Sequence, residues 1–266
     1  IVGAGNAAQA AALSAKESGA DKVVILEKAH EEMRGGNTHW SGGILRIAFD
    51  DSRMLKPFLP GVENKFLNFY DVIQPYTKKR YKEDLLRVTQ GKSDPELANI
   101  LIDNSYDTVK WAVEKAKIEC EPACSVCGVL VNGQWTFPGG VVIRAKHEGK
   151  GLSASWFEAS KNAGIEIRYG SGALELLQND KGKVIGVLSK EKDGLKKIYA
   201  KAVVLGCGGF EANSQMRAQY LGEPWDQAKV RGTSFNQGDG LRMALSIGAM
   251  PCGQWTGRHS TPIDAD

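Results

Sequence analysis

The N-terminal part of the chain alternates short apolar runs with a segment rich in small residues. Ile1-Val2 has the pattern of the end of a buried strand, and Val23-Leu26 that of a second buried strand. The alanine-rich segment between them is predicted to be helical to Ser18, with Gly19 as its C-terminal stop. The pattern therefore predicts a β-α-β unit. Because a buried strand normally runs about five residues, we expect further residues upstream of Ile1.

The middle of the chain is predicted to be mostly helical. Residues 50–93 mix aromatic and charged side chains with few glycines, which favours a helix-rich covering structure. Asp94 is a predicted N-cap with Pro95 at the first helical position. Residues 119–148 are predicted to be irregular. From Asp94 to about Lys117, apolar residues at helical spacing predict a helical stripe made of Leu97, Ile100, Leu101, Val109, Ala112, Val113 and Ala116.

The second half of the chain predicts a helix and then a run of strands that returns to the first sheet. Val203-Leu205 is the segment expected to rejoin that sheet. In chain order, the pattern predicts a helix over 152–163 ended by Gly164, a strand over 165–167, a β-meander over 173–205 with turns at 180–182 and 193–194, and a helix over 241–247 ended by Gly248.

Composition narrows the class of protein. The chain has 31 glycines in 266 residues, about a dozen more than average usage predicts. It has only 9 prolines and 42% hydrophobic residues, which excludes collagen, a linker or disorder. A net charge of +3 without a basic run does not predict nucleic-acid binding, and no apolar stretch predicts a membrane span. Five cysteines, an odd number, and no visible signal peptide favour a reducing, cytoplasmic location.

A glycine-rich turn joins the first strand to the first helix with the pattern Gly3-x-Gly5-x-x-Ala8. In such turns the first glycine makes the tight bend and the second lets the backbone approach a pyrophosphate. The small third residue keeps the helix close to the sheet. Glu27, at the end of the second strand, can accept hydrogen bonds from ribose hydroxyls and disfavours a 2′-phosphate. The unit predicts binding of FAD or NAD. The alternative is a glycine turn in an ordinary α/β unit.

A second glycine-rich segment follows the second strand. Arg34-Gly35-Gly36-Asn37-Thr38 precedes Ser41-Gly42-Gly43, so two glycine pairs stand among small polar residues. Such a loop exposes many backbone N–H groups. An NAD domain does not need them after its second strand, whereas a flavin has a long tail that extends past the pyrophosphate. The loop favours FAD, with a plain surface loop as the alternative.

Several of these segments together resemble a known family. The Gly3–Ala8 fingerprint, Glu27, the two glycine pairs, residues 203–210 and Gly238-Asp239-Gly240 resemble the FAD-binding subunits of the fumarate reductase/succinate dehydrogenase flavoprotein superfamily. Within it, Arg34–Asn37, Asp94–Leu97 and residues 238–251 are most similar to tricarballylate dehydrogenase-type proteins. The resemblance implies an α/β fold: a Rossmann-like FAD-binding domain over 1–250, with a parallel sheet, a β-meander and a helical insertion at about 50–148. Residues 251–266 would be the truncated start of a capping domain that is otherwise largely absent.

The resemblance also implies how the cofactor is bound. Succinate dehydrogenases attach FAD to a histidine whose position is held here by Gly36, with His39 three residues away, so FAD is expected to be non-covalent. Ala173 would supply backbone to the adenine, although an ordinary strand start is the alternative. Gly238-Asp239-Gly240 would be a second contact, or simply a helix start. The predicted cofactor-binding residues are Gly3, Gly5, Asn6, Ala7, Ala8, Glu27, Lys28, Arg34, Gly35, Gly36, Asn37, Thr38, Ser41, Gly42, Gly43, Ala173, Cys207, Gly208, Gly209, Gly238 and Asp239.

The reaction implied by the resemblance is dehydrogenation of a small polycarboxylate, such as tricarballylate or succinate, or the reverse reduction of a C=C bond. Hydride passes to or from flavin N5. Two alternatives stay open: a flavoprotein acting on an apolar enone or ketosteroid, and an FAD-binding module that passes electrons to a partner. Because arginine binds carboxylates bidentately, the candidates for holding the substrate are Arg46, Arg144, Arg231 and Arg258.

The catalytic residues are not identified by the sequence. Gln254-Trp255-Thr256 falls where fumarate reductases carry Gln-x-His with a substrate-binding histidine, so Thr256 replaces that residue. Gln254, Thr256 and His259 are candidates for the substrate site. The general-acid arginine of the family is expected beyond Asp266.

Three cysteines are closely spaced, as Cys120-x3-Cys124-x2-Cys127. This spacing occurs in iron–sulfur loops, and zinc would need a fourth ligand, for which His147 is the nearest candidate. A Cys124–Cys127 redox pair is another possibility. The position between a helix and a loop of a flavin domain favours free thiols, and no metal site is predicted.

Overall fold

The N-terminal β-α-β unit lies at the centre of the fold. The computed structural model describes residues 1–259. Helix α1 (Asn6–Glu17) connects the segment at Val2 to β1 (Val24–Leu26), and β1 pairs in parallel with β7 (Glu166–Arg168). Val2 forms parallel bridges to both Leu26 and Leu205. The parallel sheet therefore runs β7, β1, Val2 segment, Leu205 segment, and the predicted return of the chain to the first sheet is present.

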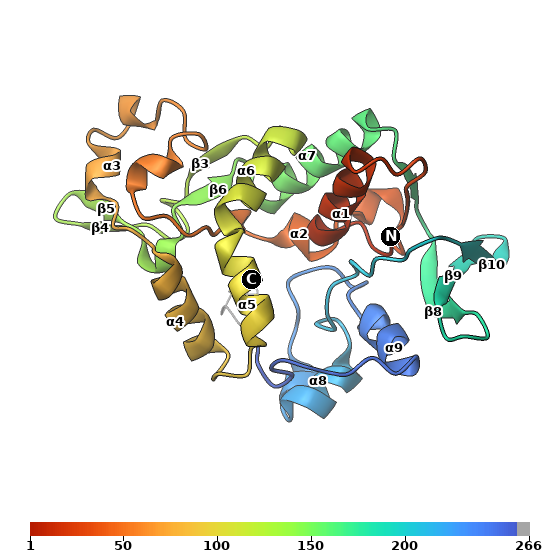
Figure 1. The fold of residues 1–266 in the computed structure, drawn as a ribbon. Helices are drawn as coiled ribbons and strands as arrows, with labels where there is room; N and C mark the ends of the chain where they lie inside the picture. The colour runs from red at the N-terminus through yellow and green to blue at the C-terminus, as the bar shows by residue number, and fades with distance from the viewer. Residues whose placement is uncertain (260–266) are drawn as a thin grey trace.

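Helices α1 and α7 (Glu148–Asn162) lie side by side against this sheet (Figure 1). Ala12, Ile25 and Trp156 are buried in the core between them. Burying side chains of this size is the dominant favourable contribution to folding. The core thus fixes how the first residues of both helices lie relative to the ends of the strands.

Helix α7 begins at Glu148, not at residue 152 as predicted. Gly149 and Gly151 lie within its first turn, although glycine usually weakens a helix. A Cβ at Gly149 would stand 2.1 Å from the carbonyl oxygen of Thr38, and one at Gly151 would stand 1.9 Å from that of Lys146. The two glycines are therefore helical residues that allow close backbone approach, and this approach is a tertiary feature that the local pattern does not contain.

The insertion between β1 and α7 has its own hydrophobic core, around Phe49, Phe58, Phe69 and Tyr76. It lies on the side of the molecule opposite the β-meander (Figure 1). The predicted helix-rich covering structure is present. Its helices between residues 50 and 117 are the 3-10 helices η2 (Ser52–Leu55) and η3 (Val62–Asn64), followed by α3 (Phe69–Val72), α4 (Lys78–Val88), α5 (Pro95–Asp103) and α6 (Ser105–Ala116).

The helical stripe predicted from Asp94 to about Lys117 is helical but not continuous. The segment forms two helices, because Asn104 ends α5 and its side-chain amide donates to the Ile100 carbonyl oxygen at 2.8 Å. Local side-chain hydrogen bonds of this kind compete with helix continuation. The buried face of α5 is made by Ala98 and Ile102. The residues Leu97, Ile100 and Leu101 of the apolar stripe are 60%, 53% and 52% exposed.

Residues 119–148, predicted to be irregular, contain four short strands. They are β3 (Cys120–Pro122), β4 (Val129–Val131), β5 (Gln134–Thr136) and β6 (Ile143–Ala145). Strand β6 lies between β3 and β2 (Ile44–Leu45) in an antiparallel sheet, and β4 pairs with β5 as a hairpin. The pairing of β6 with β2 joins residues about a hundred positions apart, and strands of two or three residues carry too little pattern to be predicted locally.

The predicted β-meander is confirmed. Strands β8 (Gly172–Gln178), β9 (Val184–Glu191) and β10 (Gly194–Tyr199) form an antiparallel sheet. Its Ala173 packs with Met243 of α9 (Asp239–Ser246). Helix α8 (Ser214–Leu221) and the 3-10 helix η5 (Trp225–Gln227) precede α9. Within the described part of the chain, no helix combines the length and apolarity needed to cross a bilayer.

Candidate cofactor site

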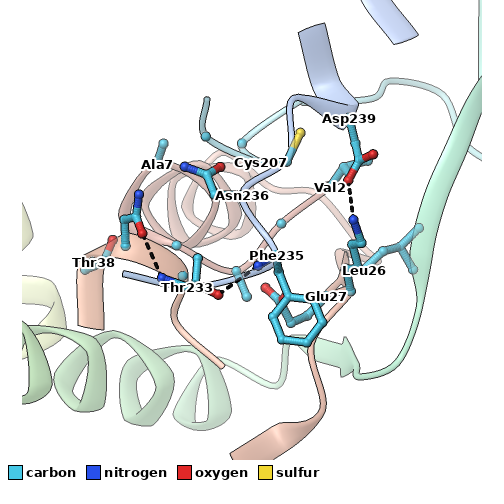
Figure 2. Close-up of a pocket in the computed structure, with 18 of the residues that line it drawn as sticks. Val2, Ala7, Leu26, Glu27, Thr38, Cys207, Thr233, Phe235, Asn236 and Asp239 are labelled. Carbon is cyan, nitrogen blue, oxygen red and sulfur yellow. Dashed lines mark hydrogen bonds and ion pairs between the residues drawn. The ribbon is translucent and has the colours of Figure 1, made fainter. Parts of the chain in front are cut away.

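A cleft opens at the carboxyl ends of the parallel strands, where ligands of doubly wound sheets bind. It has a cavity volume of about 290 Å³. Figure 2 shows its walls, which come from the first β-α turn, the end of β1, α2 (Gly36–Trp40), the turn at 206–208 and the segment before α9. Its lining residues are Val2, Gly3, Ala4, Gly5, Asn6, Ala7, Leu26, Glu27, Lys28, Gly36, Asn37, Thr38, Ser171, Ala173, Gly206, Cys207, Gly208, Thr233, Phe235, Asn236 and Asp239.

The two glycines of the first turn face different neighbours. Gly3 has a φ of +93°, and a Cβ there would stand 2.6 Å from the carbonyl oxygen of Gly206. At Gly5 the nearest atom to such a Cβ would be the Thr38 Oγ1 at 3.5 Å, which is an ordinary contact. The fold itself therefore requires glycine at position 3. The space beside Gly5 belongs to the cleft and is available to a ligand.

The N-terminus of α1 points its free backbone N–H groups toward the cleft, where they favour an anion. Gly5 is its N-cap and has no side chain to cap it. The Thr38 hydroxyl reaches across from α2 and accepts a hydrogen bond from the Asn6 backbone N–H at 2.9 Å. The first turn of α1 and the first turn of α2 therefore form one polar end of the cleft.

Glu27 is a buried acid in the wall of the cleft, with 7% of its surface exposed. Burial raises the pKa of its carboxyl group, and backbone N–H donors, among them that of Ala29 at 2.8 Å, act against this rise. A carboxylate has about four acceptor sites on its two oxygens. Glu27 can therefore also accept hydrogen bonds from hydroxyl groups of a ligand, as the sequence predicted.

Lys28 and Asp239 join the two walls of the cleft at its β1 end. The Lys28 Nζ lies 2.8 Å from the Asp239 Oδ2, and it also donates to the Gln237 Oε1 at 3.4 Å. The contact with Asp239 is drawn as a dashed line in Figure 2. The pair links the residue after Glu27 to the first turn of α9, so it fixes the width of the cleft on this side.

The structure brings only part of the predicted glycine loop to the cleft. Gly36, Asn37 and Thr38 line it, because residues 36–40 form the short helix α2, whose first turn faces the cleft. The other predicted loop residues are not among those that line the cleft, and each contacts another part of the protein. The Arg34 guanidinium packs over Phe157, a Cβ at Gly35 would meet Ser153, Ser41 bonds to Thr38, Gly42 lies beside Ile44 and Gly43 lies against Glu148.

Three further predicted residues support the wall without lining it. Ala8 lies directly beneath Gly206, where a Cβ would stand 2.8 Å from the Ala8 Cβ. Gly209 accepts a hydrogen bond from the Gly238 N–H at 2.8 Å. The remaining predicted residues of this side, Ala173, Cys207, Gly208 and Asp239, do line the cleft.

Sequence reasoning missed residues 233–236, of which Thr233, Phe235 and Asn236 line the cleft. The Thr233 N–H donates to the Asn37 Oδ1 at 3.1 Å, and the Phe235 N–H donates to the Thr233 Oγ1 at 3.2 Å. Figure 2 shows the Phe235 ring beside Glu27. The segment lies directly before Gly238-Asp239-Gly240, and that position in the chain was the only signal that could have identified it.

The candidate substrate residues lie elsewhere. Gln254, Thr256 and His259 are not among the residues of the cleft wall. Their segment is held by Trp255, whose ring stacks on Phe210 at a centroid distance of 6.4 Å.

Three of the four candidate arginines are engaged with other side chains. The Arg144 guanidinium lies 2.7 Å from Glu121 and 3.2 Å from Glu148. Arg46 lies over the rings of Tyr76 and Tyr81, and the Arg258 guanidinium lies 3.9 Å from the Trp225 ring centroid. Arg231 is exposed.

The three closely spaced cysteines are free thiols in the structure. Burial raises the pKa of all three, that of Cys120 to about 11. Metal ligands must be deprotonated, so this environment disfavours thiolate coordination. Over residues 1–259, no three or more histidine, cysteine or acidic side chains are grouped as metal ligands.

Comparison with known proteins shows which family this chain matches. Residues 1–256 match the family described as FAD binding domain. A fumarate reductase (cytochrome) of Shewanella frigidimarina is 29% identical over 98% of this chain and 42% of its own length. A urocanate reductase of Eggerthella lenta is 30% identical over 94% of this chain and 38% of its own length. The chain thus spans about two fifths of these relatives.

Solved structures agree with this match. The open conformation of a flavocytochrome c3 fumarate reductase superposes with a TM-score of 0.70 and 27% identity, over 94% of this chain and 40% of that one. A 3-ketosteroid Δ1-dehydrogenase from Sterolibacterium denitrificans has a TM-score of 0.72 and 19% identity, over 94% of this chain and 54% of that one. The second likeness concerns the fold alone.

Proposed function

Because the chain belongs to the FAD binding domain family and so binds FAD, we propose that it is the cofactor-binding part of an oxidoreductase that acts on CH–CH or C=C bonds. The observation that carries this proposal is the cleft. It places the ligand-facing Gly5, the N-terminus of α1 and the buried carboxyl group of Glu27 around one space. This set provides backbone donors for a pyrophosphate and an acceptor for ribose hydroxyls.

The residues present fit FAD. A Cβ at Gly5 would project into the cleft without meeting another part of the protein closer than 3.5 Å, so the empty position suits close backbone approach by a ligand. The N–H groups of α1 would hold the pyrophosphate, and Glu27 the ribose. Asn37 and Thr38, from the first turn of α2, would contact the part of FAD that continues toward the flavin.

Bound FAD supplies the hydride acceptor or donor of the reaction at its N5 atom. The contributions of this chain are binding and orientation. Its glycine backbone would hold the pyrophosphate, and the Lys28–Asp239 pair holds α9 against the end of β1. We propose that FAD is held non-covalently, because Gly36 cannot form a bond to the flavin.

For the substrate we propose a small polycarboxylate, such as tricarballylate, succinate or fumarate. Relatives named as fumarate and urocanate reductases support this proposal. A second candidate is an apolar enone. This candidate is favoured because Arg46, Arg144 and Arg258 are already engaged with other side chains and so are not available to bind a substrate carboxylate. A relative named as digoxin reductase, 27% identical over 96% of this chain, is consistent with that second candidate.

Spectroscopy tests the cofactor and the substrate separately. The purified protein should show a flavin absorption band at ~450 nm. Acid precipitation should leave a colourless pellet and a yellow supernatant, and a yellow pellet would contradict non-covalent binding. In the whole protein under anaerobic conditions, tricarballylate or succinate should bleach the flavin. If only an apolar enone reoxidises the reduced flavin and neither carboxylate bleaches the oxidised form, the carboxylate proposal is wrong.

A further inference from the structure

A contact between two helices controls one side chain of the cleft wall. Trp156 lies in α7 with 2% of its surface exposed, and its indole N–H donates a hydrogen bond to the Asn6 Oδ1. Asn6 is the first residue of α1 and lines the cleft. Trp156 itself is not part of the cleft wall. It can therefore affect a ligand only through Asn6.

The indole is held firmly in its position. Trp156 belongs to the hydrophobic core between α1, α7 and the sheet, and its ring lies 6.3 Å from the ring of Trp111. One turn further along, the Ser160 hydroxyl donates to the Gln9 Oε1 across the same pair of helices. This second polar contact fixes α1 against α7, so the indole cannot move away from Asn6 without disturbing a buried contact.

The chemistry of the indole determines the orientation of the amide. An indole N–H only donates hydrogen bonds, whereas an asparagine side chain has one accepting oxygen and one donating nitrogen. The Asn6 oxygen must therefore be the branch that faces Trp156, which leaves the Nδ2 group as the other branch. A phosphate offers only acceptors, so an amide with this orientation can bind it, and the flipped amide would repel it.

We propose that Trp156 is a positioning residue for FAD: it holds the Asn6 amide so that its nitrogen, and not its oxygen, faces the pyrophosphate. The proposal rests on the FAD site described above. The Asn6 backbone N–H already donates to the Thr38 Oγ1 at 2.9 Å, so the side-chain nitrogen is the donor that this residue adds. The ligand class concerned is a nucleoside diphosphate.

The test compares ligands with and without the diphosphate. Binding of FAD, ADP and adenosine is measured by calorimetry for the wild type, Trp156→Phe and Trp111→Phe. Trp111 is a matched control, because its indole N–H donates to the Glu17 Oε2 at 2.7 Å, away from the cleft. We expect Trp156→Phe to weaken FAD and ADP about three- to tenfold, with adenosine changed less than twofold. Trp111→Phe should change none of the three affinities.

The outcomes separate this proposal from the FAD site itself. Equal weakening of ADP and adenosine by Trp156→Phe, or no weakening of either, overturns the positioning role. If the wild-type protein binds neither FAD nor ADP, the cofactor site is wrong instead. If Trp156→Phe fails to fold, the proposal is tested instead with the variants Asn6→Asp and Asn6→Leu. The aspartate variant, which carries oxygens in both branches, should bind ADP at least tenfold more weakly than wild type and more weakly than the leucine variant. Equal ADP binding by wild type and Asn6→Asp overturns the proposal.

Discussion

Replacing Gly3 by alanine tests whether the first turn is built by close backbone contact. Gly3 and Gly19 both have a positive φ, of +93° and +88°. A Cβ at Gly3 would stand 2.6 Å from the Gly206 carbonyl oxygen and 2.9 Å from the Cys207 Cα. A Cβ at Gly19 would meet nothing within 4 Å. The pair of variants therefore separates backbone strain from steric conflict.

The expected magnitudes follow from these two terms. The left-handed conformation costs a non-glycine residue about 1–2 kcal/mol, and this is all that Gly19→Ala should lose. At Gly3 the obstructing atoms are backbone atoms of the returning strand and cannot rotate aside, which adds about 1–3 kcal/mol of overpacking. Gly3→Ala should therefore lose about 2–5 kcal/mol, a large part of the about 5–15 kcal/mol that stabilises a typical domain.

The assay is urea unfolding of both variants and the wild type, followed by far-ultraviolet circular dichroism at one temperature. The free energy of unfolding should fall in the order wild type, Gly19→Ala, Gly3→Ala. The slope with urea should be the same for all three, so that the midpoints report stability directly. If Gly3→Ala is no less stable than Gly19→Ala, then the contact with Gly206 is not the reason for a glycine in this turn, and the close packing of the two strands is wrong.

Three further predictions concern Gly5, Glu27 and the cysteines. Gly5→Ala should keep the wild-type stability within about 1 kcal/mol, because its Cβ would meet no protein atom closer than 3.5 Å. It should abolish the flavin band, because the same Cβ would occupy space beside the cleft that the ligand needs. Burial raises the pKa of Glu27, so the native state gains stability as the pH falls through that raised pKa and loses it as the pH rises. FAD affinity should fall over the same interval as the carboxylate is protonated, and Glu27→Gln, titrated in parallel, should show neither pH dependence. In a thiol titration at neutral pH the exposed Cys252 should react first, and Cys120, with a pKa of about 11, should react last. Early modification of Cys120 would contradict its burial.

The parts of the fold that the sequence predicted are those with local signals. The turn at Gly3 and the meander turns each follow from a few neighbouring residues, and the structure has all of them. The pairing of β6 with β2 depends instead on residues about a hundred positions apart, and its strands are too short to show a pattern. The break at Asn104 also escaped prediction, because apolar spacing continues through it and only the side-chain hydrogen bond to Ile100 marks it.

In the candidate site, too, the residues with a local signal were predicted and those that depend on distant contacts were not. The predicted fingerprint residues and Glu27 line the cleft or lie directly beneath it. They could be predicted because the motif is set by the local geometry of the turn between strand and helix. In the second glycine loop, prediction treated every small residue as a ligand contact. The structure shows that Gly35 and Gly43 are small because Ser153 and the Glu148 backbone lie against them. A glycine in a sequence shows that something approaches closely, but not whether that neighbour is a ligand or the protein itself.

This distinction changes the interpretation of the glycine surplus. Gly3 and Gly206 are required by the protein, because Gly3 lies against the returning strand and Gly206 lies against Ala8. Gly149 belongs to the same class, because it brings the first turn of α7 against the Thr38 carbonyl. These contacts draw the returning strand against α1, and α7 against α2, so the ends of all these segments border one small cleft. Gly5 differs, because no protein atom requires it. Gly3, Gly206 and Gly149, which lie against other backbone, thus help to build the cleft. At Gly5, which lines the cleft and has no protein atom closer than 3.5 Å to a Cβ, a ligand is expected to take the place of the neighbour.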